Sequence, residues 1–142
     1  MTVAAILKHK GHDVATVEPT AKVMEVAAVL SARRIGAVLV LDGAEQMLGI
    51  VSERDIVRSL AANGPLTLEM TAGQLMTRVL HTVDLATTEV AAMEVMTANR
   101  VRHLPVLDHG KLVGVISIGD VVKARIMQQA LEVDSLKAYV SA

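Results

Sequence analysis

Apolar and polar residues follow the same order of helical and extended patterns twice along the chain. In the first copy, Val23, Val26, Ala27 and Leu30 recur at helical spacing. Two short runs rich in Val, Leu and Ile follow, which is typical of strands covered on both faces. The pattern therefore predicts a strand over 14–17, a helix over 22–34, strands over 37–41 and 47–52, and a last helix that begins at Ser52.

The second copy repeats this order. Val90, Met93 and Met96–Thr97 lie at helical spacing and two aliphatic runs follow them. The pattern predicts a strand over 79–83, a helix over 88–100, strands over 103–107 and 112–117, and a helix from Ser117. Asp42-Gly43 and Asp108-His109-Gly110 separate the paired strands, so we expect hairpin turns in which glycine supplies the positive φ.

Identical residues recur at a spacing of about 65 positions, which indicates a duplicated unit. Gly49-Ile50-Val51-Ser52 matches Gly114-Val115-Ile116-Ser117, and Asp55 matches Asp120. We therefore divide the chain into repeat 1 (1–66), repeat 2 (67–127) and a helical tail (128–142). Short helices over 3–7 and 71–76 precede the two copies. One repeat alone is too small for a stable core, so we expect the two sheets to pack face to face around a single shared core.

Composition narrows the range of possible functions. The chain has 142 residues, of which 52% are hydrophobic, and its net charge is −1. A chain without basic excess is a poor candidate for nucleic-acid binding. The absence of cysteine excludes disulfides and thiolate metal sites. No apolar run reaches the roughly 18 residues that span a bilayer, so we expect a cytoplasmic protein. His9 and His12 lie close together, but we interpret them as solvated residues and predict no metal site.

The duplicated Ser-x-x-Asp segments carry the candidate chemistry. Each begins a helix after a strand, which places the hydroxyl and the carboxylate on one turn. A carboxylate there can accept hydrogen bonds from ribose hydroxyls, and the first N–H groups of the helix attract phosphate. The alternative is a plain helix cap with an acidic first turn. Recurrence at equivalent positions favours the binding interpretation.

The segments 49–55 and 114–120, both Gly-h-h-Ser-x-x-Asp (h, hydrophobic), together with 102–108, resemble the signature of the CBS-domain family. The resemblance covers residues 1–127 and is closest to stand-alone bacterial CBS-pair proteins. It implies an α/β (α+β) fold in which two CBS βαββα repeats pack sheet to sheet as one CBS pair, or Bateman module. It also implies nucleotide binding in the cleft between the repeats and assembly into a homodimer.

The resemblance implies two sites, each with the Ser and Asp of one repeat and the base-binding residues of the other. The Asp120 site combines Ser117, Gly119 and Asp120 with Lys10, Val14, Ala15, Gly36, Ala37 and Val38. The Asp55 site combines Ser52, Arg54 and Asp55 with Leu80, His81, Val101, Arg102, His103 and Leu104. The Asp55 site holds more basic side chains near its turn, so we expect it to prefer ligands with more phosphate.

These features together predict a regulatory module that needs no cofactor and senses AMP, ATP or NAD(H); an S-adenosyl compound is a weaker candidate. Its expected partners are a second copy of the chain and an unidentified regulated protein, with no nucleic acid and no membrane. We do not expect an enzyme, because no dinucleotide-binding, Walker, cysteine-nucleophile or Gly-x-Ser-x-Gly motif is present. The alternative is a docking or dimerisation scaffold whose pockets are degenerate.

Overall fold

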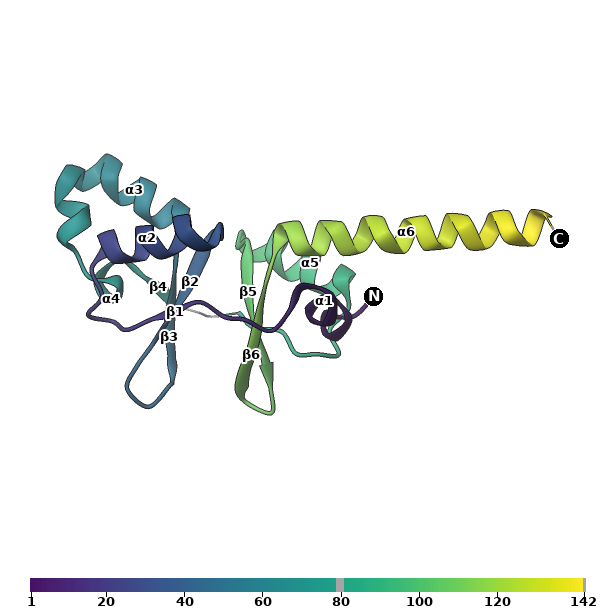
Figure 1. The fold of residues 1–142 in the computed structure, drawn as a ribbon, viewed down its shortest axis with the longest axis horizontal. Helices are drawn as coiled ribbons and strands as arrows, with labels where there is room; N and C mark the ends of the chain where they lie inside the picture. Colours follow the sequence, from purple (N-terminus) through teal and green to yellow (C-terminus); the bar gives the residue numbers. More distant parts are fainter. Residues whose placement is uncertain (79–80, 142) are drawn as a thin grey trace. The chain divides into compact units, whose positions relative to one another are not determined.

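The computed structural model describes residues 1–78 and 81–141, which form two compact units (Figure 1). One unit, here called the central unit, is Val14–Leu80. The other is called the split unit, because it combines Met1–Asp13 with His81–Ala142, from both ends of the chain. The compact units therefore do not coincide with the two sequence copies, since the helix ahead of each copy packs with the other copy.

The central unit is built on a four-stranded sheet in the order β1-β2-β3-β4. β1 pairs with β2 in parallel, and the remaining neighbours are antiparallel. Its elements are β1 (Thr16–Val17), α2 (Val23–Arg33), β2 (Ala37–Leu41), β3 (Met47–Ser52), α3 (Glu53–Asn63), the 3₁₀ helix η1 (Gly64–Glu69), α4 (Ala72–Leu75) and β4 (Thr77–Arg78).

The split unit repeats the hairpin and helix arrangement. β5 and β6 pair antiparallel, and Val83 bridges Val106 in parallel, as β1 does with β2 in the central unit. Its elements are α1 (Val3–Lys10), α5 (Glu89–Asn99), β5 (His103–Asp108), β6 (Lys111–Ser117) and α6 (Ile118–Ser141).

Most of the predicted elements are confirmed, several to within a residue. β2 and β3 have the predicted bounds, and Ser52 caps α3 as expected. The tail is helical up to Ser141 as the continuous end of α6, and the short helices before both copies are present. Of the strand predicted over 79–83, residues 79–80 lie outside the described part of the chain, and residues 81–83 contribute only the bridge at Val83.

Two local predictions are wrong. Gly43 is not in the positive-φ region; Glu45 is, at φ 60°, because the loop spans five residues in which Asp42 Oδ1 accepts hydrogen bonds from Ala44 N and Gln46 N. The second hairpin does follow the prediction, with His109 and Gly110 both at positive φ. On α5, Met96 is buried as predicted, but Val90 is exposed, while Glu89 and Ala92 are buried.

Each unit has its own buried apolar cluster, and the single core shared by the two sheets stays a prediction. The central cluster comprises Val23, Val26, Leu30, Val38, Val40, Val51, Ile56 and Ala72. The split-unit cluster comprises Val3, Ile6, Leu7, Val83, Ala92, Met96, Leu104, Val106, Ile116, Val121 and Ala124.

A glycine in the second strand of each hairpin, Gly49 in β3 and Gly114 in β6, leaves room for the helix that precedes each copy. A Cβ at Gly114 would lie 2.8 Å from Leu7 Cδ2, on α1. A Cβ at Gly49 would lie 2.7 Å from Met76 Sδ and 2.7 Å from the Thr77 carbonyl oxygen. Both glycines therefore provide space for the segment that begins with α1 or α4.

A buried carboxylate fixes the start of the chain. Glu89 is 3% exposed, and its oxygens lie 2.8 Å from the Met1 amino group and 3.6 Å from Arg125 Nη1. The hydrogen bond from the amino group, helped by both positive charges, keeps the pKa of Glu89 below its ordinary value despite burial. α1 is thereby tied to α5 and α6.

Candidate functional site: two Ser-x-x-Asp turns

The first turn begins α3 in the central unit. Asp55 N donates to Ser52 Oγ at 3.3 Å, and Ser52 N donates to Asp55 Oδ2 at 2.8 Å. Ser52 Oγ also donates to the same carboxylate oxygen at 3.0 Å. These contacts form a capping box, which satisfies backbone N–H groups that the helix leaves unpaired.

Thr77 completes the surroundings of Asp55. Its Oγ1 donates to Asp55 Oδ1 at 3.2 Å. Both oxygens of this carboxylate therefore have hydrogen-bond donors from the protein. Its orientation is fixed on one side by the cap and on the other by the start of β4.

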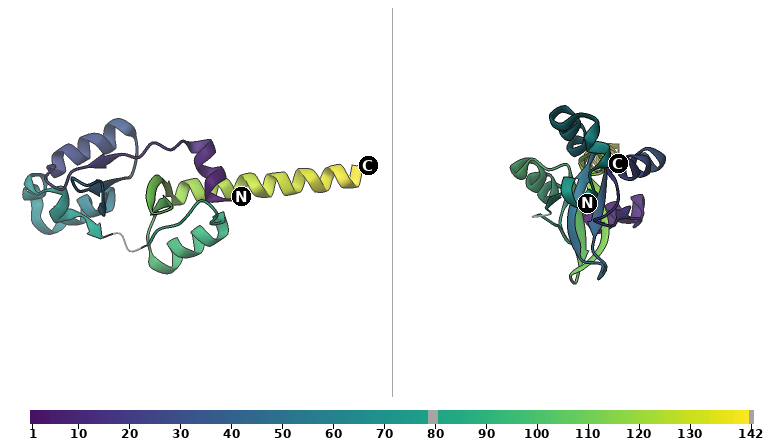
Figure 2. Two further views of the ribbon diagram at one scale, coloured as in Figure 1. Left: turned by 90° about the horizontal axis from the view of Figure 1, so that it is seen from below. Right: turned by 90° about the vertical axis from the view of Figure 1, so that its left-hand side faces the viewer.

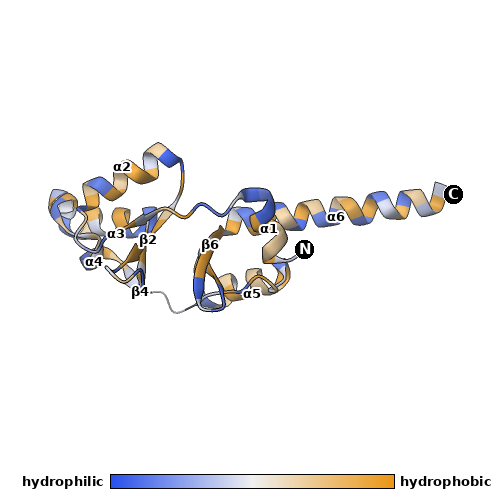
Figure 3. Cartoon of the chain, turned by 60° about the horizontal axis from the view of Figure 1, so that its bottom comes forward, coloured by the Kyte–Doolittle hydropathy of each residue, from blue (hydrophilic) through white to orange (hydrophobic). Residues whose placement is uncertain are grey.

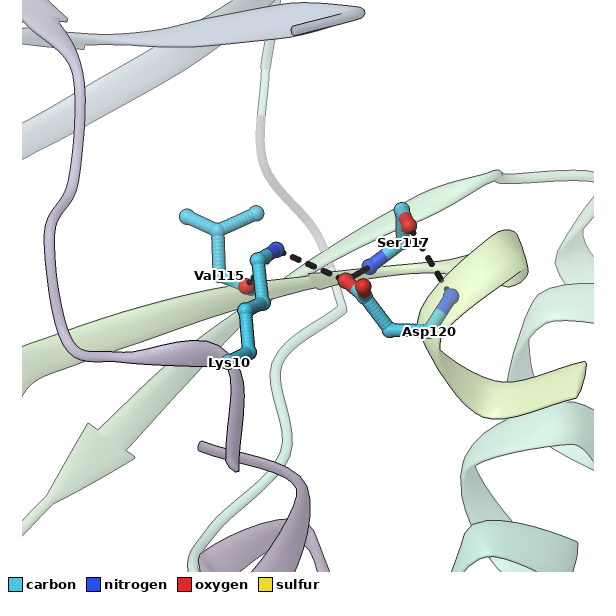
Figure 4. Close-up of polar contacts among 4 residues, drawn as sticks. All are labelled: Lys10, Val115, Ser117 and Asp120. Atoms are coloured by element: carbon cyan, nitrogen blue, oxygen red, sulfur yellow. Dashed lines mark hydrogen bonds and ion pairs between the residues drawn. The ribbon is translucent and has the colours of Figure 1, made fainter. Parts of the chain in front are cut away.

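The second turn begins α6 in the split unit and repeats the geometry (Figure 4). Ser117 N donates to Asp120 Oδ2 at 2.8 Å, and Asp120 N donates to Ser117 Oγ at 3.2 Å. Lys10 Nζ donates to the same Oδ2 at 2.7 Å and to the Val115 carbonyl at 2.8 Å. Each of these donors to the carboxylate contacts Oδ2, so a ligand would approach through Oδ1.

The carboxylate of Asp120 in the second turn is charged although it is partly buried. Burial raises the pKa of Asp120, but the hydrogen bond from Lys10, the Ser117 N–H and the Lys10 charge together hold that pKa below its ordinary value. The side chain of Asp120 is 21% exposed and that of Lys10 is 37% exposed. Asp120 is therefore ionised at neutral pH and remains accessible as an acceptor.

A cavity of about 260 Å³ lies beside this turn, between α1 and the first half of α6. Three of its side chains are basic (His9, Lys10 and Lys123), Asp120 is acidic, and the others are apolar. Its lining is Met1, Ala5, Ile6, His9, Lys10, Asp120, Lys123, Ala124 and Met127. Its volume is slightly below the range of about 300–1,000 Å³ of most ligand pockets, so it suits part of a nucleotide, such as a sugar or a phosphate.

Four of the residues that the resemblance assigns to the sites lie next to the turn of their own unit. Gly36 O accepts from Glu53 N at 3.0 Å, and Ala37 pairs with Ser52. In the same way Arg102 O accepts from Ile118 N at 2.8 Å, and His103 pairs with Ser117.

The other members of the predicted sets differ in exposure. Ala15 accepts from Leu39 N, and Val38 and Leu104 are buried. The exposed members are Arg54, Arg102 and Gly119, and the partly exposed members are Val14, Ala15, Gly36, Ala37, His81, Val101 and His103. Leu80 lies outside the described residues. Grouping residues of one unit with the turn of the other remains a prediction.

Sequence reasoning missed Thr77, His9 and Lys123 as site residues, whereas it grouped Lys10 with Asp120, which the structure brings together. Thr2 and Thr71 both cap the helix that precedes a copy, but the donor to the nearby Asp is Lys10 at the end of α1 in one case and Thr77 after the end of α4 in the other. An alignment of the two caps therefore does not match Lys10 with Thr77.

His12, which we interpreted as solvated, contacts the protein backbone, whereas His109 extends into solvent. His12 Nδ1 lies 3.1 Å from the Val113 carbonyl, and the side chain of His109 is 94% exposed. Among the described residues, no group of three or more potential ligands is arranged to hold a metal ion. None of the described helices has both the length and the apolar character needed to cross a bilayer.

Comparison with known proteins relates this geometry to a family. The CBS domain family model matches residues 4–62 and 72–126. The mitochondrial CBS domain-containing protein CBSX3 of Arabidopsis thaliana is 32% identical over 149 residues, covering 98% of this chain and 71% of the relative.

Two solved structures share the fold. The CBS-domain containing protein ATU1752 from Agrobacterium tumefaciens is 44% identical, with a TM-score of 0.85 over 87% of this chain and 92% of that protein. The CBS domain protein PAE2072 from Pyrobaculum aerophilum, solved in complex with AMP, is 28% identical, with a TM-score of 0.74 over 84% of this chain and 89% of that protein.

Proposed function

The chain belongs to the CBS-domain family, and on that premise we propose that it is a regulatory module that binds an adenosine nucleotide at its Ser-x-x-Asp turns. The observation that carries the proposal is the duplicated turn: in both units a carboxylate is held in a fixed orientation at the start of a helix. The AMP complex of the similar Pyrobaculum protein supports the class of ligand. The ligands we propose are AMP, ATP or NAD(H).

At the second turn, Asp120 Oδ1 would accept the ribose hydroxyls while Oδ2 remains with Ser117 and Lys10. Since Asp120 is ionised, these would be charge-assisted hydrogen bonds, which are stronger than those between neutral groups. Lys10, His9 and Lys123 would supply positive charge for a phosphate group. The N–H groups at the start of α6 add a partial positive charge.

At the first turn, ribose hydroxyls would share Asp55 with Thr77. A ribose hydroxyl that displaces the Thr77 hydroxyl exchanges one hydrogen bond for another, so the net gain is smaller than at Asp120. Arg54 directly precedes Asp55 and is exposed, so it is available to an additional phosphate. Because the set predicted for this site also includes Arg102 and His103, we propose that the first turn prefers ligands with more phosphate.

Regulation would follow from a shift in the populations of the conformations of this chain. A bound nucleotide changes the conformational equilibrium only to the extent that it binds one conformation more tightly than the other. We propose that this change is read by a second copy of the chain and by a separate regulated protein in the cytoplasm.

Isothermal titration calorimetry of the full chain with AMP and with ATP tests the proposal. The variants are Asp55→Asn and Asp120→Asn, because asparagine can still accept a hydrogen bond within the turn but carries no charge. A hydrogen bond to a charged group contributes about 1.5–3 kcal/mol, so each variant should lose about tenfold or more in affinity at its own site.

The matched control is Asp42→Asn, a carboxylate that also accepts two backbone N–H groups but lies in a hairpin loop. It should bind like the wild type. Wild-type binding that neither Asp55→Asn nor Asp120→Asn weakens would show that the nucleotide binds elsewhere.

A docking scaffold is the second candidate, and one observation favours it. Both carboxylates serve as caps, and Asp55 already has donors on both oxygens, so a purely structural role accounts for them. A scaffold would give no heat of binding with any adenosine compound at millimolar concentration, while its stability would still fall in the Asp variants.

A further inference from the structure

The second half of α6 has no partner within its own unit. α6 is 24 residues long, but its buried residues, Val121 and Ala124, lie in its first two turns. Every residue from 129 to 141 is exposed. Figure 2 shows this part of the helix extending beyond the other elements of the split unit. An isolated helical segment of this length is marginal in water, so a partner is expected to stabilise it.

The exposed part carries a regular apolar seam. Six residues of α6 are spaced alternately four and three positions apart, which is the spacing of heptad positions d and a. They are Val122, Ile126, Gln129, Val133, Leu136 and Val140. Its apolar members are exposed, at 42% for Val122, 60% for Ile126, 50% for Val133, 64% for Leu136 and 76% for Val140. Hydrophobic bands recur along the whole of α6 in Figure 3.

The seam lies on the opposite side of α6 from its packed face. With Ile126 at heptad position a, the buried Val121 and Ala124 fall at positions c and f. Positions c and f point away from positions a and d on a helical wheel. A partner can therefore contact the full seam from Val122 to Val140 without displacing the contacts of α6 with its own unit.

We propose that residues 122–140 of α6 form a parallel, two-stranded coiled coil with the same residues of a second copy of this chain. Ile126, Val133 and Val140 are β-branched residues at position a, and Leu136 is at position d, a combination that favours parallel dimers. Gln129, at position d, is the polar residue of the seam and faces Gln129 of the second copy in a parallel dimer.

Charges beside the seam are complementary between two copies. Glu132 occupies position g and Lys137 occupies position e of the next heptad, and these positions face each other across a parallel dimer. Two-fold symmetry forms this ion pair twice. An antiparallel pair would instead bring Lys137 towards Lys123 of the other helix, both at position e, with like charges. The arrangement therefore selects a second, parallel copy.

Cysteine cross-linking of the full chain tests the geometry, since the natural sequence has no cysteine. Gln129→Cys and Val140→Cys place a thiol in the seam, and Ala138→Cys places one at position f on the same exposed helix. Under mild oxidation the two seam variants should form disulfide-linked dimers at least tenfold faster than Ala138→Cys. Equal rates at all three positions, or no cross-link in the seam, would overturn the proposal.

Charge reversal tests the partner and the orientation separately from folding. In the Val140→Cys background, Glu132→Lys and Lys137→Glu each create like-charge pairs, but a mixture of the two variants restores both attractive pairs. The mixture should give mainly the mixed disulfide dimer. A statistical ratio of mixed to unmixed dimers would contradict the parallel register, whatever other surface joins the chains.

Discussion

The two glycines that accept the preceding helices allow a quantitative test of the fold. Replacing Gly114 with alanine would place a Cβ 2.8 Å from Leu7 Cδ2 and 2.9 Å from Leu7 Cδ1, where carbon atoms normally approach to about 3.5–4.0 Å. Leu7 is fully buried, so it has little freedom to withdraw. Overpacking of this kind destabilises proteins by about 1–3 kcal/mol.

Gly49→Ala should be the more damaging change. Its Cβ would meet the backbone carbonyl oxygen of Thr77 at 2.7 Å as well as Met76 Sδ at 2.7 Å. A backbone atom cannot move without shifting β4, whereas the Leu7 side chain can adjust slightly. We expect losses of about 2–3 kcal/mol for Gly49→Ala and about 1–2 kcal/mol for Gly114→Ala, after the gain of about 0.4–1 kcal/mol from restricting the unfolded chain.

Urea unfolding of the full chain provides the measurement, with Gly43→Ala as the matched control. Gly43 has no atom within 4 Å of an added Cβ and is not at positive φ, so its variant should be neutral or slightly stabilised. A double-mutant cycle with Leu7→Val should show that the smaller side chain relieves part of the Gly114→Ala loss. Full stability in Gly114→Ala, or additive losses in the cycle, would refute the packing of α1 against β6.

Two further predictions concern ion pairs. Lys10→Met should reduce the free energy of unfolding by about 1 kcal/mol or less at pH 7, since the Lys10–Asp120 pair is partly exposed. The pKa of Asp120 is lowered in the folded state. The stabilisation by this pair is therefore present above the pKa of Asp120 in the unfolded chain and is lost as pH falls through its pKa in the folded chain. Urea unfolding at pH 7 and at pH 3 should show the difference from wild type shrinking in acid, and a constant difference would contradict the pairing. Glu89→Gln should cost about 1–3 kcal/mol by removing a buried charge that bonds to Met1 and lies near Arg125. The exposed Glu94→Gln on the same helix should be neutral, and equal stability of the two variants would rule out the special role of Glu89.

Local pattern was sufficient for the strands and caps. β2 and β3 are continuous aliphatic runs bounded by turn residues, and Ser52 and Ser117 are strong cap residues, so the positions of these elements were predictable. The internal repeat added the correspondence of Asp55 with Asp120. These features depend on residues close together in the sequence or on direct repetition.

The features that were missed depend on distant partners. Glu89 is buried, in place of Val90, because the Met1 amino group and Arg125 accompany it. Thr77 contacts Asp55 across a long sequence separation that no periodicity reports, whereas Lys10 was grouped with Asp120 only through the family resemblance. In the first hairpin, the hydrogen bonds that Asp42 Oδ1 accepts from Ala44 N and Gln46 N shift the positive φ from Gly43 to Glu45.

Equilibrium dialysis of labelled AMP against the full chain tests most directly whether the Ser-x-x-Asp turns bind a nucleotide. The account predicts saturable binding to the wild type and to Asp42→Asn, and loss of that binding in the double variant Asp55→Asn/Asp120→Asn, provided that circular dichroism shows the variant to be folded. Undiminished AMP binding by the folded double variant, or no binding by the wild type at millimolar AMP, would contradict it.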